Sequence, residues 1–396
     1  MLWRIKSLAP WIASRAGVTV GSAWSAIWTF PSVIGLAMVI AWAAEVSQYF
    51  ISQAMALAIL AWLQTLPEFM VEAVIAWHQD ISLMTANFTG SLRLLVGLGW
   101  PLIYVVAAIG SRRRGKGPLR EIILDESHCI EVLGLFLPIL YFFRIYFKAT
   151  ITLVDSGILI FFYVAYIAIL SRMPPEEEPE PSEQPYIPRK ILGFSPRLRM
   201  ATIVSMFTGG AVGLYMVADS FLSSMLGVAT AMGVSYFIFV QWVAPFLSEF
   251  PEKVSAIYWA QRDKMSSMAM MNMVSSNINQ WTMLVAMIPI VYSFSRGQPS
   301  FIPLDESHRM EILLTIAQST LGFLLLCDMR FRWYEAIVMF GSWLAQFLVP
   351  HLREEVTIFY FGWVVVHLIM VIAGKRKLDA FHLIPKILGK KPNREA

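Results

Sequence analysis

The chain has 396 residues, of which 57% are hydrophobic and 15% charged, and its mean hydropathy is +0.61. Soluble domains carry about a quarter charged residues, so the composition excludes an ordinary soluble protein. The formal net charge is only +4, and the bases cluster near the ends of apolar segments, which favours membrane topology over nucleic-acid binding. The two cysteines, Cys129 and Cys327, predict neither a disulfide framework nor a zinc site.

Apolar segments long enough to cross a bilayer recur along the chain. They predict an all-α polytopic membrane protein. We expect eleven spans, at about 25–48, 51–77, 82–111, 128–147, 152–172, 202–223, 227–260, 265–295, 309–327, 333–350 and 354–374. The basic and apolar residues within 1–24 predict an N-terminal helix that lies in the membrane interface.

Lys and Arg are concentrated in three places: residues 111–120, the linker 172–199 and the tail that follows the last span. The positive-inside rule places all three in the cytoplasm. We therefore expect an integral protein of a prokaryotic-type inner or plasma membrane. Its linker is rich in Pro and Glu over 173–188, which predicts an exposed tether. The expected division of the chain is 1–24, 25–172 (first repeat), 173–200 (linker), 201–350 (second repeat) and 351–396 (an extra helix and the tail).

Two motifs occur once in each half at nearly the same offset. "LDESHCIEVL" (124–133) returns as "LDESHRMEIL" (304–313), and "TLPEF" (65–69) returns as "EFPEK" (249–253). The repetition indicates an internal duplication. Because each half holds five spans, an odd number, the second half is expected to be inverted in the membrane. Inverted repeats are typical of transporters whose site lies near the midplane.

The LDESH copies contain residue types that bind metals, but we favour helix capping. Asp or Ser before an apolar run caps a helix, and acids favour its N-terminus. The expected topology also puts the copies on opposite faces of the membrane, where they could not share an ion. The residues concerned are Asp125, Glu126, His128 and Glu131, and Asp305, Glu306, His308 and Glu311.

Each half also has a Pro-Glu pair inside apolar sequence, Pro67–Glu68 and Pro251–Glu252, followed by a helix rich in amides and hydroxyls. Proline frees a backbone carbonyl one turn earlier, and carboxylates with carbonyls suit hard cations such as Ca²⁺. Polar residues also join membrane helices, but intramembrane glutamates indicate function. The candidate ligands are Gln64, Thr65, Glu68, Glu72, Asn87 and Ser91 in the first half, and Ser248, Glu249, Glu252, Asn272, Ser276 and Gln280 in the second.

These segments resemble the alpha repeats of the sodium/calcium exchanger, or cation/calcium antiporter, superfamily. The first copy is "LQTLPE" (63–68) with "ANFTGSL" (86–92), and the second is "LSEFPE" (247–252) with "MNMVSSN" (271–277). The resemblance implies ten helices in two inverted halves and ions bound by the repeats. It implies that Glu68 and Glu252 are the central ligands, and that Thr65, Ser91, Ser248 and Ser276 supply hydroxyl and carbonyl oxygens.

The chain departs from that pattern. Gln64 replaces a threonine, Glu249 replaces a serine, Leu95 and Gln280 stand where the family often has Asn or Asp, and Ser275 is an alternative match to Ser276. Each half also carries a base, Arg93 or Lys253.

The base in each half has two interpretations. Arg93 could neutralise one of Glu68 and Glu72, and Lys253 could pair with Glu249 at i,i+4, which would leave Glu68 and Glu252 for one divalent ion. In a stronger form, one base takes the place of a co-transported sodium. Alternatively, both bases extend to a membrane interface. Glu72 is then either a ligand or the balance for Arg93.

The pattern predicts a secondary active transporter that exchanges Ca²⁺ for Na⁺ or H⁺ by alternating access. Its partners would be inorganic cations and lipid, and no nucleic acid or cofactor is expected. The first helices of the two halves would slide or rock against the rest. A transport-inactive homologue acting as a membrane scaffold is the alternative. No hydrolase or nucleotide-binding motif is present, so we do not expect an enzyme.

Overall fold

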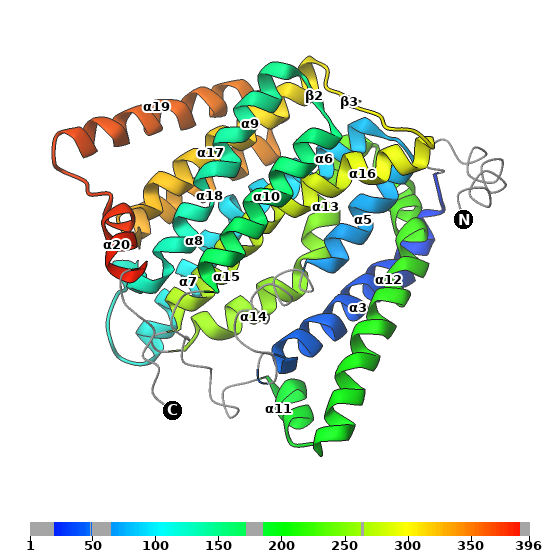
Figure 1. Cartoon of the computed structure of the whole chain (residues 1–396), viewed down its shortest axis with the longest axis horizontal. Coiled ribbons are helices and arrows are strands. Elements are labelled where there is room, and N and C mark those ends of the chain that lie inside the picture. Colours follow the sequence, from blue (N-terminus) through cyan, green and yellow to red (C-terminus); the bar gives the residue numbers. More distant parts are fainter. Residues whose placement is uncertain (1–19, 48, 50–64, 172–184, 263–264, 389–396) are drawn as a thin grey trace.

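The computed structural model describes residues 20–47, 49, 65–171, 185–262 and 265–388. Almost all of its regular structure is helical (Figure 1). Several predictions lie outside the described residues, namely the interfacial N-terminal helix, most of the second span, the Pro- and Glu-rich part of the linker, and Gln64.

The first half contains a long helix, two helices that carry the Pro-Glu and amide motifs, and a final pair that follows LDESH. Its elements are η1 (Ala23–Ser25), α3 (Ala26–Ser47), α5 (Leu66–Trp77), α6 (Ile81–Leu94), η2 (Leu95–Gly99), α7 (Trp100–Arg113), β1 (Glu121–Ile123), η3 (Glu126–His128), α8 (Cys129–Gly134), α9 (Phe136–Lys148), β2 (Thr150–Ile151) and α10 (Leu153–Leu170).

The second half follows the same order after a short linker helix. Its elements are α11 (Tyr186–Leu192), α12 (Pro196–Met232), α13 (Tyr236–Ser248), α14 (Phe250–Ala260), α15 (Ser266–Asn279), η5 (Gln280–Leu284), α16 (Val285–Arg296), β3 (Ile302–Pro303), α17 (Glu306–Leu326), β4 (Arg330–Arg332), α18 (Trp333–Leu348), η6 (Pro350–Leu352), α19 (Arg353–Ile372) and α20 (Asp379–Leu388).

Within the described residues, seven helices are long and apolar enough to cross a membrane. They match the first, third, fourth, fifth, sixth, ninth and eleventh predicted spans. Of the other predicted spans, the second lies mostly outside the described residues, and the seventh, eighth and tenth correspond to helices that are short, polar or interrupted. The prediction of one helix over 227–260 is wrong, because α12 runs on to Met232 and ends at Gly233, whose φ of +67° is a left-handed conformation suited to glycine. The chain then breaks again between α13 and α14.

Two small sheets join the halves. Strand β1 of the first half pairs antiparallel with β4 of the second, and β2 pairs antiparallel with β3. Each strand before an LDESH motif is therefore matched by the strand that follows LDESH in the other half. This crosswise pairing of strands is the arrangement expected for two repeats related by a twofold axis. It separates the LDESH copies, since one adjoins each sheet.

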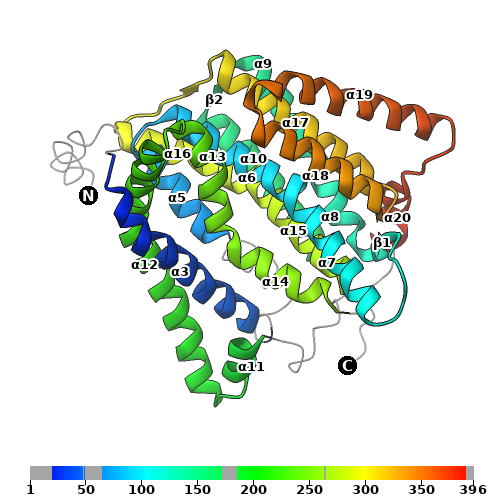
Figure 2. The same cartoon turned by 180° about the vertical axis from the view of Figure 1, so that it is seen from behind.

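Helices α3 and α12 form a layer along one side of the molecule (Figures 1 and 2). They approach closely where α12 has glycines: a Cβ built on Gly210 would lie 2.5 Å from Ile40, and one on Gly213 would lie 2.6 Å from Leu36. Thr29 and Ser224 add a hydrogen bond of 2.7 Å between their hydroxyls. The first long helices of the two halves thus pack mainly on each other.

The C-terminal region contains two helices, α19 and α20, in addition to its basic residues. Helix α19 packs on α17, and α20 docks near α8, where the backbone N–H of Ala380 donates to the carbonyl of Cys327 at 2.9 Å. Arg376, between these helices, contacts Asp328 at 2.6 Å and Glu335 at 2.8 Å. The tail therefore lies at the same end of the molecule as the β1–β4 sheet.

Candidate cation site

Each Pro-Glu pair lies at the start of a helix. Pro67 and Glu68 occupy the first turn of α5, and Pro251 and Glu252 occupy the first turn of α14. Proline is tolerated there because its missing N–H would have no partner in the helix. The unpaired N–H groups and the helix dipole of a first turn also favour a carboxylate. This position explains how both glutamates are tolerated inside the protein, where they are 1% and 4% exposed.

The two half-helices meet through Gln280, which lies at the start of the π-helical segment η5. Its side-chain amide nitrogen donates to Glu68 Oε2 and to Glu249 Oε1, both at 2.9 Å. Glu252 lies within electrostatic range of Glu68 and Glu249. Side chains from both halves thus form one cluster, which we call the carboxylate cluster: Glu68, Glu249, Glu252, Lys253 and Gln280.

Lys253 pairs inside this cluster. Its ammonium lies 2.6 Å from Glu249 Oε2, one helical turn away, and both side chains are almost fully buried. The predicted i,i+4 pair is therefore confirmed. The alternative that Lys253 extends to a membrane interface is wrong, because only 4% of the residue is exposed. Glu249 itself stands at the break between α13 and α14.

Several oxygens around the cluster have no hydrogen-bond partner among the described residues. They include Glu68 Oε1, Glu252 Oε2 and Gln280 Oε1. Ser91 lies beside Glu68 and Glu249, and Ser276 lies beside Glu252. Buried oxygens normally find a partner, so these acceptors are available to a further donor or to a cation.

Glu72 belongs to a separate pair. Its Oε2 accepts from the Asn87 side-chain nitrogen at 2.5 Å, and both side chains are fully buried. Glu72 lies one turn beyond Glu68 on α5. Glu72 and Asn87 therefore lie next to the carboxylate cluster and are hydrogen-bonded to each other.

The remaining predicted ligands have other contacts. The Thr65 hydroxyl accepts from the Asn279 side chain at 2.5 Å, and the Ser248 hydroxyl donates to the carbonyl of Ala244 at 2.9 Å. Asn272 is half-buried on α15, and its side-chain nitrogen has no hydrogen-bond partner among the described residues. Asn279 was not predicted, although it directly precedes Gln280 in the polar run of α15.

Arg93 takes no part in this site, and the predicted balance between Arg93 and Glu72 is wrong. Its guanidinium lies 2.5 Å from Glu311 Oε2 and donates to Gln346 Oε1 at 2.9 Å and to the Thr89 carbonyl at 3.2 Å. The residue is completely buried, so the interface alternative is wrong as well.

Glu311 joins Arg93 to a second base. Arg353, the first residue of α19, also forms an ion pair with Glu311, and Gln241 donates to Glu311 Oε2 at 2.9 Å. The sequence analysis missed this network, because its members lie far apart in the chain.

The LDESH copies differ in their capping. Asp305 caps α17, since its side chain accepts from the backbone N–H of His308 at 2.9 Å. Asp125 makes no such bond to η3. The capping prediction is therefore confirmed in the second copy only. Glu311, in the second copy, forms an ion pair with Arg93. In the first copy, Glu126 forms an ion pair with Lys386 of α20 at 2.9 Å.

Each half contains a π-helical segment where its polar helix passes the cluster. They are η2, which begins at Leu95, and η5, which begins at Gln280. Single π turns inside α-helices are rare and often occur at functional sites. The two segments occupy the same place in each repeat and differ in the side chain at their start, which is apolar in η2 and polar in η5.

No three His, Cys, Asp or Glu side chains gather closely enough to hold a metal ion alone within the described parts of the chain. A cation at the carboxylate cluster would therefore need neutral oxygens as well. Those of Gln280, Ser91 and Ser276 are the nearest available. Such a mixed set of carboxylate and neutral oxygens suits a hard cation that passes through as cargo.

The family model described as sodium/calcium exchanger protein matches residues 19–172 and 202–350. The chain belongs to the sodium/calcium exchanger family. The resemblance seen in the Pro-Glu segments is thereby confirmed, and membership supports a role in cation antiport across a membrane. The matched ranges cover both repeats and leave out the linker and the C-terminal region.

Solved structures agree with this membership. The crystal structure of the H⁺/Ca²⁺ exchanger CAX is 30% identical, with a TM-score of 0.84 and coverage of 98% of each chain. A structure of the sodium-calcium exchanger NCX_Mj is 15% identical, with a TM-score of 0.55, and covers 83% of this chain and 99% of its own. Native YfkE, at 15% identity and a TM-score of 0.61, covers 83% and 91%. The last two show the exchanger fold alone. A comparison with curated proteins gave no significant match.

Proposed function

We propose that this protein exchanges Ca²⁺ for protons by alternating access at the carboxylate cluster. The observation that carries the proposal is that Glu68 and Glu252, one from each half, lie within electrostatic range of each other, while Gln280 joins Glu68 to Glu249. Inverted-repeat transporters bind their ions where such interrupted helices meet. Both glutamates retain an oxygen with no partner among the described residues.

The charge of the cluster fits one divalent ion or two protons. Three ionised carboxylates and the Lys253 ammonium would leave two negative charges, and the contact of Lys253 with Glu249 assigns them to Glu68 and Glu252. Occupancy by either one Ca²⁺ or two protons would neutralise the site. Competition between these cargoes for the same two carboxylates would then couple their movements.

Protons are favoured over sodium by two observations. Lys253 already forms an ion pair with Glu249, and Gln280 donates a hydrogen bond to Glu68. Fewer anionic oxygens therefore remain for separate sodium ions. In addition, the relative with 30% identity over 98% of both chains is an H⁺/Ca²⁺ exchanger, whereas the NCX_Mj structure is 15% identical.

Flux in proteoliposomes tests the proposal. An outward-directed gradient of either protons or sodium is imposed in separate experiments. We expect only the proton gradient to drive Ca²⁺ uptake. Glu68→Gln and Glu252→Gln should each abolish uptake. Glu306→Gln is the matched control, because Glu306 is exposed and lies outside the cluster.

Uptake driven only by sodium would overturn the proton assignment and leave antiport intact. A folded protein that neither transports nor binds Ca²⁺ would instead support the scaffold alternative. Normal uptake by both glutamine variants would remove the cluster from the mechanism.

A further inference from the structure

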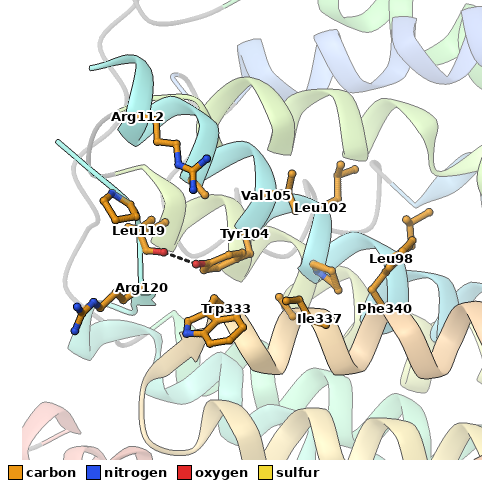
Figure 3. A pocket seen from close by; sticks show the side chains of 14 residues that line it. Leu98, Leu102, Tyr104, Val105, Arg112, Leu119, Arg120, Trp333, Ile337 and Phe340 are labelled. Carbon is orange, nitrogen blue, oxygen red and sulfur yellow. Dashed lines mark hydrogen bonds between the residues drawn. The ribbon is translucent and has the colours of Figure 1, made fainter. Parts of the chain in front are cut away.

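A cavity of about 650 Å³ lies between α7 of the first half and α18 of the second, away from the carboxylate cluster (Figure 3). Its wall is mainly apolar and includes Leu98, Leu102, Ile337 and Phe340. None of the predicted cation ligands lines it. The cavity is therefore a separate feature of the molecule that transport of a cation does not explain.

One end of the cavity is basic. Arg112 and Arg120 lie at this end, while Leu98 and Phe340 lie at the other (Figure 3). The β1–β4 sheet sets the position of Arg120, whose carbonyl accepts from the backbone N–H of Trp333 at 3.1 Å. A bond from the Tyr104 hydroxyl to the Leu119 carbonyl closes the same end.

The two arginines at this end have no acidic partner among the described residues. The neighbouring bases of β4 are different, because Arg330 and Arg332 both contact Glu121, at 2.7 Å and 3.5 Å. Arg112 and Arg120 are exposed. The cavity thus joins an apolar wall to two positive charges that no described acid of this chain neutralises.

The wall is open to the lipid side of the helices. Val105 is 49% exposed, Ile337 is 61% exposed and Trp333, at the basic end, is 51% exposed. Tryptophan is enriched at the membrane–water interface. Leu98 and Arg112 are fourteen residues apart on one continuous helical segment, which corresponds to about 21 Å. This length is close to that of one leaflet with its headgroups, since a whole bilayer is about 40–45 Å thick.

We propose that this cavity binds one anionic phospholipid, with an acyl chain between α7 and α18 and the phosphate between Arg112 and Arg120. An apolar wall of leaflet depth suits an acyl chain, and arginine binds phosphate oxygens through paired N–H groups. Basic pockets between membrane helices on the cytoplasmic side take anionic headgroups. The bound lipid would join the two repeats on the face opposite the exposed layer of α3 and α12, whichever cation is transported.

Quenching of Trp333 by brominated lipid tests this proposal. The full chain is reconstituted in phosphatidylcholine containing phosphatidylglycerol, and only one of the two lipids carries bromine, at the same mole fraction. The Trp333 contribution is the difference between the natural chain and Trp333→Phe. We expect stronger Trp333 quenching by brominated phosphatidylglycerol than by brominated phosphatidylcholine.

Arginine variants distinguish lipid binding at a specific site from general electrostatic attraction to anionic lipid. Arg112→Gln and Arg120→Gln should each lower the preference for phosphatidylglycerol by about fivefold, the effect expected for one base near an anionic surface. Arg113→Gln is the matched control, since Arg113 is an exposed neighbour that does not line the cavity. It should leave the preference unchanged. A melting temperature that phosphatidylglycerol raises in Arg113→Gln but not in Arg112→Gln would support the site independently.

Three results would overturn the proposal. The first is equal quenching by the two brominated lipids. The second is the same loss in Arg113→Gln as in Arg112→Gln, which would show diffuse attraction. The third is cross-linking of two copies through Ile337→Cys together with exclusion of both brominated lipids, which would show that a second copy covers the cavity.

Discussion

Lys253 and Arg93 are both buried bases, and each forms an ion pair with a glutamate. Glu249 and Lys253 lie four residues apart, where helical geometry brings side chains together, and their contact measures 2.6 Å. Arg93 and Glu311 are separated by 218 positions. Charge counting in the first repeat offered only Glu68 or Glu72 as a partner for Arg93, whereas the fold brings Glu311 to Arg93 and pairs Glu72 with Asn87.

Lys253→Met should impair both stability and transport. Removal of one partner leaves the Glu249 carboxylate buried without its cation, which costs about 3–5 kcal/mol. It also adds an uncompensated negative charge to the site for Ca²⁺. We expect a lower melting temperature in detergent and at least about tenfold less Ca²⁺ uptake, which corresponds to about 1.4 kcal/mol.

The double variant Lys253→Met with Glu249→Gln is the control for this charge effect. A neutral pair removes the unpaired charge, and the new amide oxygen still accepts from Gln280. Stability and uptake should therefore recover in large part. If the double variant is as impaired as the single one, the ammonium has a role beyond neutralising Glu249.

At the scale of helices, close packing depends on particular glycines. Helix α6, which carries the "ANFTGS" motif, packs on α13 through Gly90. A Cβ built on Gly90 would lie 1.9 Å from the carbonyl oxygen of Gln241. A backbone atom cannot rotate away as a side chain does, so one of the two helices would have to move.

Gly90→Ala should therefore destabilise the protein, by at least the 1–3 kcal/mol that is typical of an overpacked core. Thermal unfolding in detergent, with Ca²⁺ uptake measured in parallel, gives the result. Gly157→Ala is the matched control, because nothing lies within 4 Å of a Cβ at this position on α10. It should be neutral or slightly stabilising, since alanine favours a helix over glycine by about 1 kcal/mol. Equal melting temperatures for the two variants would contradict the close α6–α13 contact.

At the scale of the whole molecule, α3 and α12 form the part best placed to move. They fit together through small residues, and among the described residues two polar side-chain links join them to the Pro-Glu helices. Glu45 of α3 accepts from Ser255 of α14 at 2.5 Å, and Asp219 of α12 contacts His78 at the end of α5 at 2.6 Å. Sliding of the α3–α12 layer would break both links and change access to the cluster.

Cross-links distinguish movement of the layer from movement within it. A bifunctional thiol reagent applied to Thr29→Cys with Ser224→Cys joins α3 to α12, and Ca²⁺ uptake should persist because the layer still moves as one unit. The same reagent applied to His78→Cys with Asp219→Cys joins α12 to the end of α5. It should stop uptake, and reduction of the cross-link should restore it.

The reverse pattern would contradict a sliding layer. If the bridge within the layer stops uptake, α3 and α12 must move past each other. If the bridge to the end of α5 has no effect, the layer does not move relative to that helix. The uncross-linked double variants, measured before the reagent is added, control for the substitutions themselves.

Local patterns in the chain were enough to predict the membrane class, the duplication, the family and the two Pro-Glu glutamates. These follow from hydropathy, repeated motifs and helix-breaking residues, all of which act over a few neighbouring positions. Only the tertiary structure decided that Gln280 joins Glu68 to Glu249, that Arg93 lies outside the site, and that Arg112 and Arg120 share a cavity with α18. The physical reason is that the partner of a buried polar group depends on distance in space, and inverted packing brings together residues that are remote in the chain.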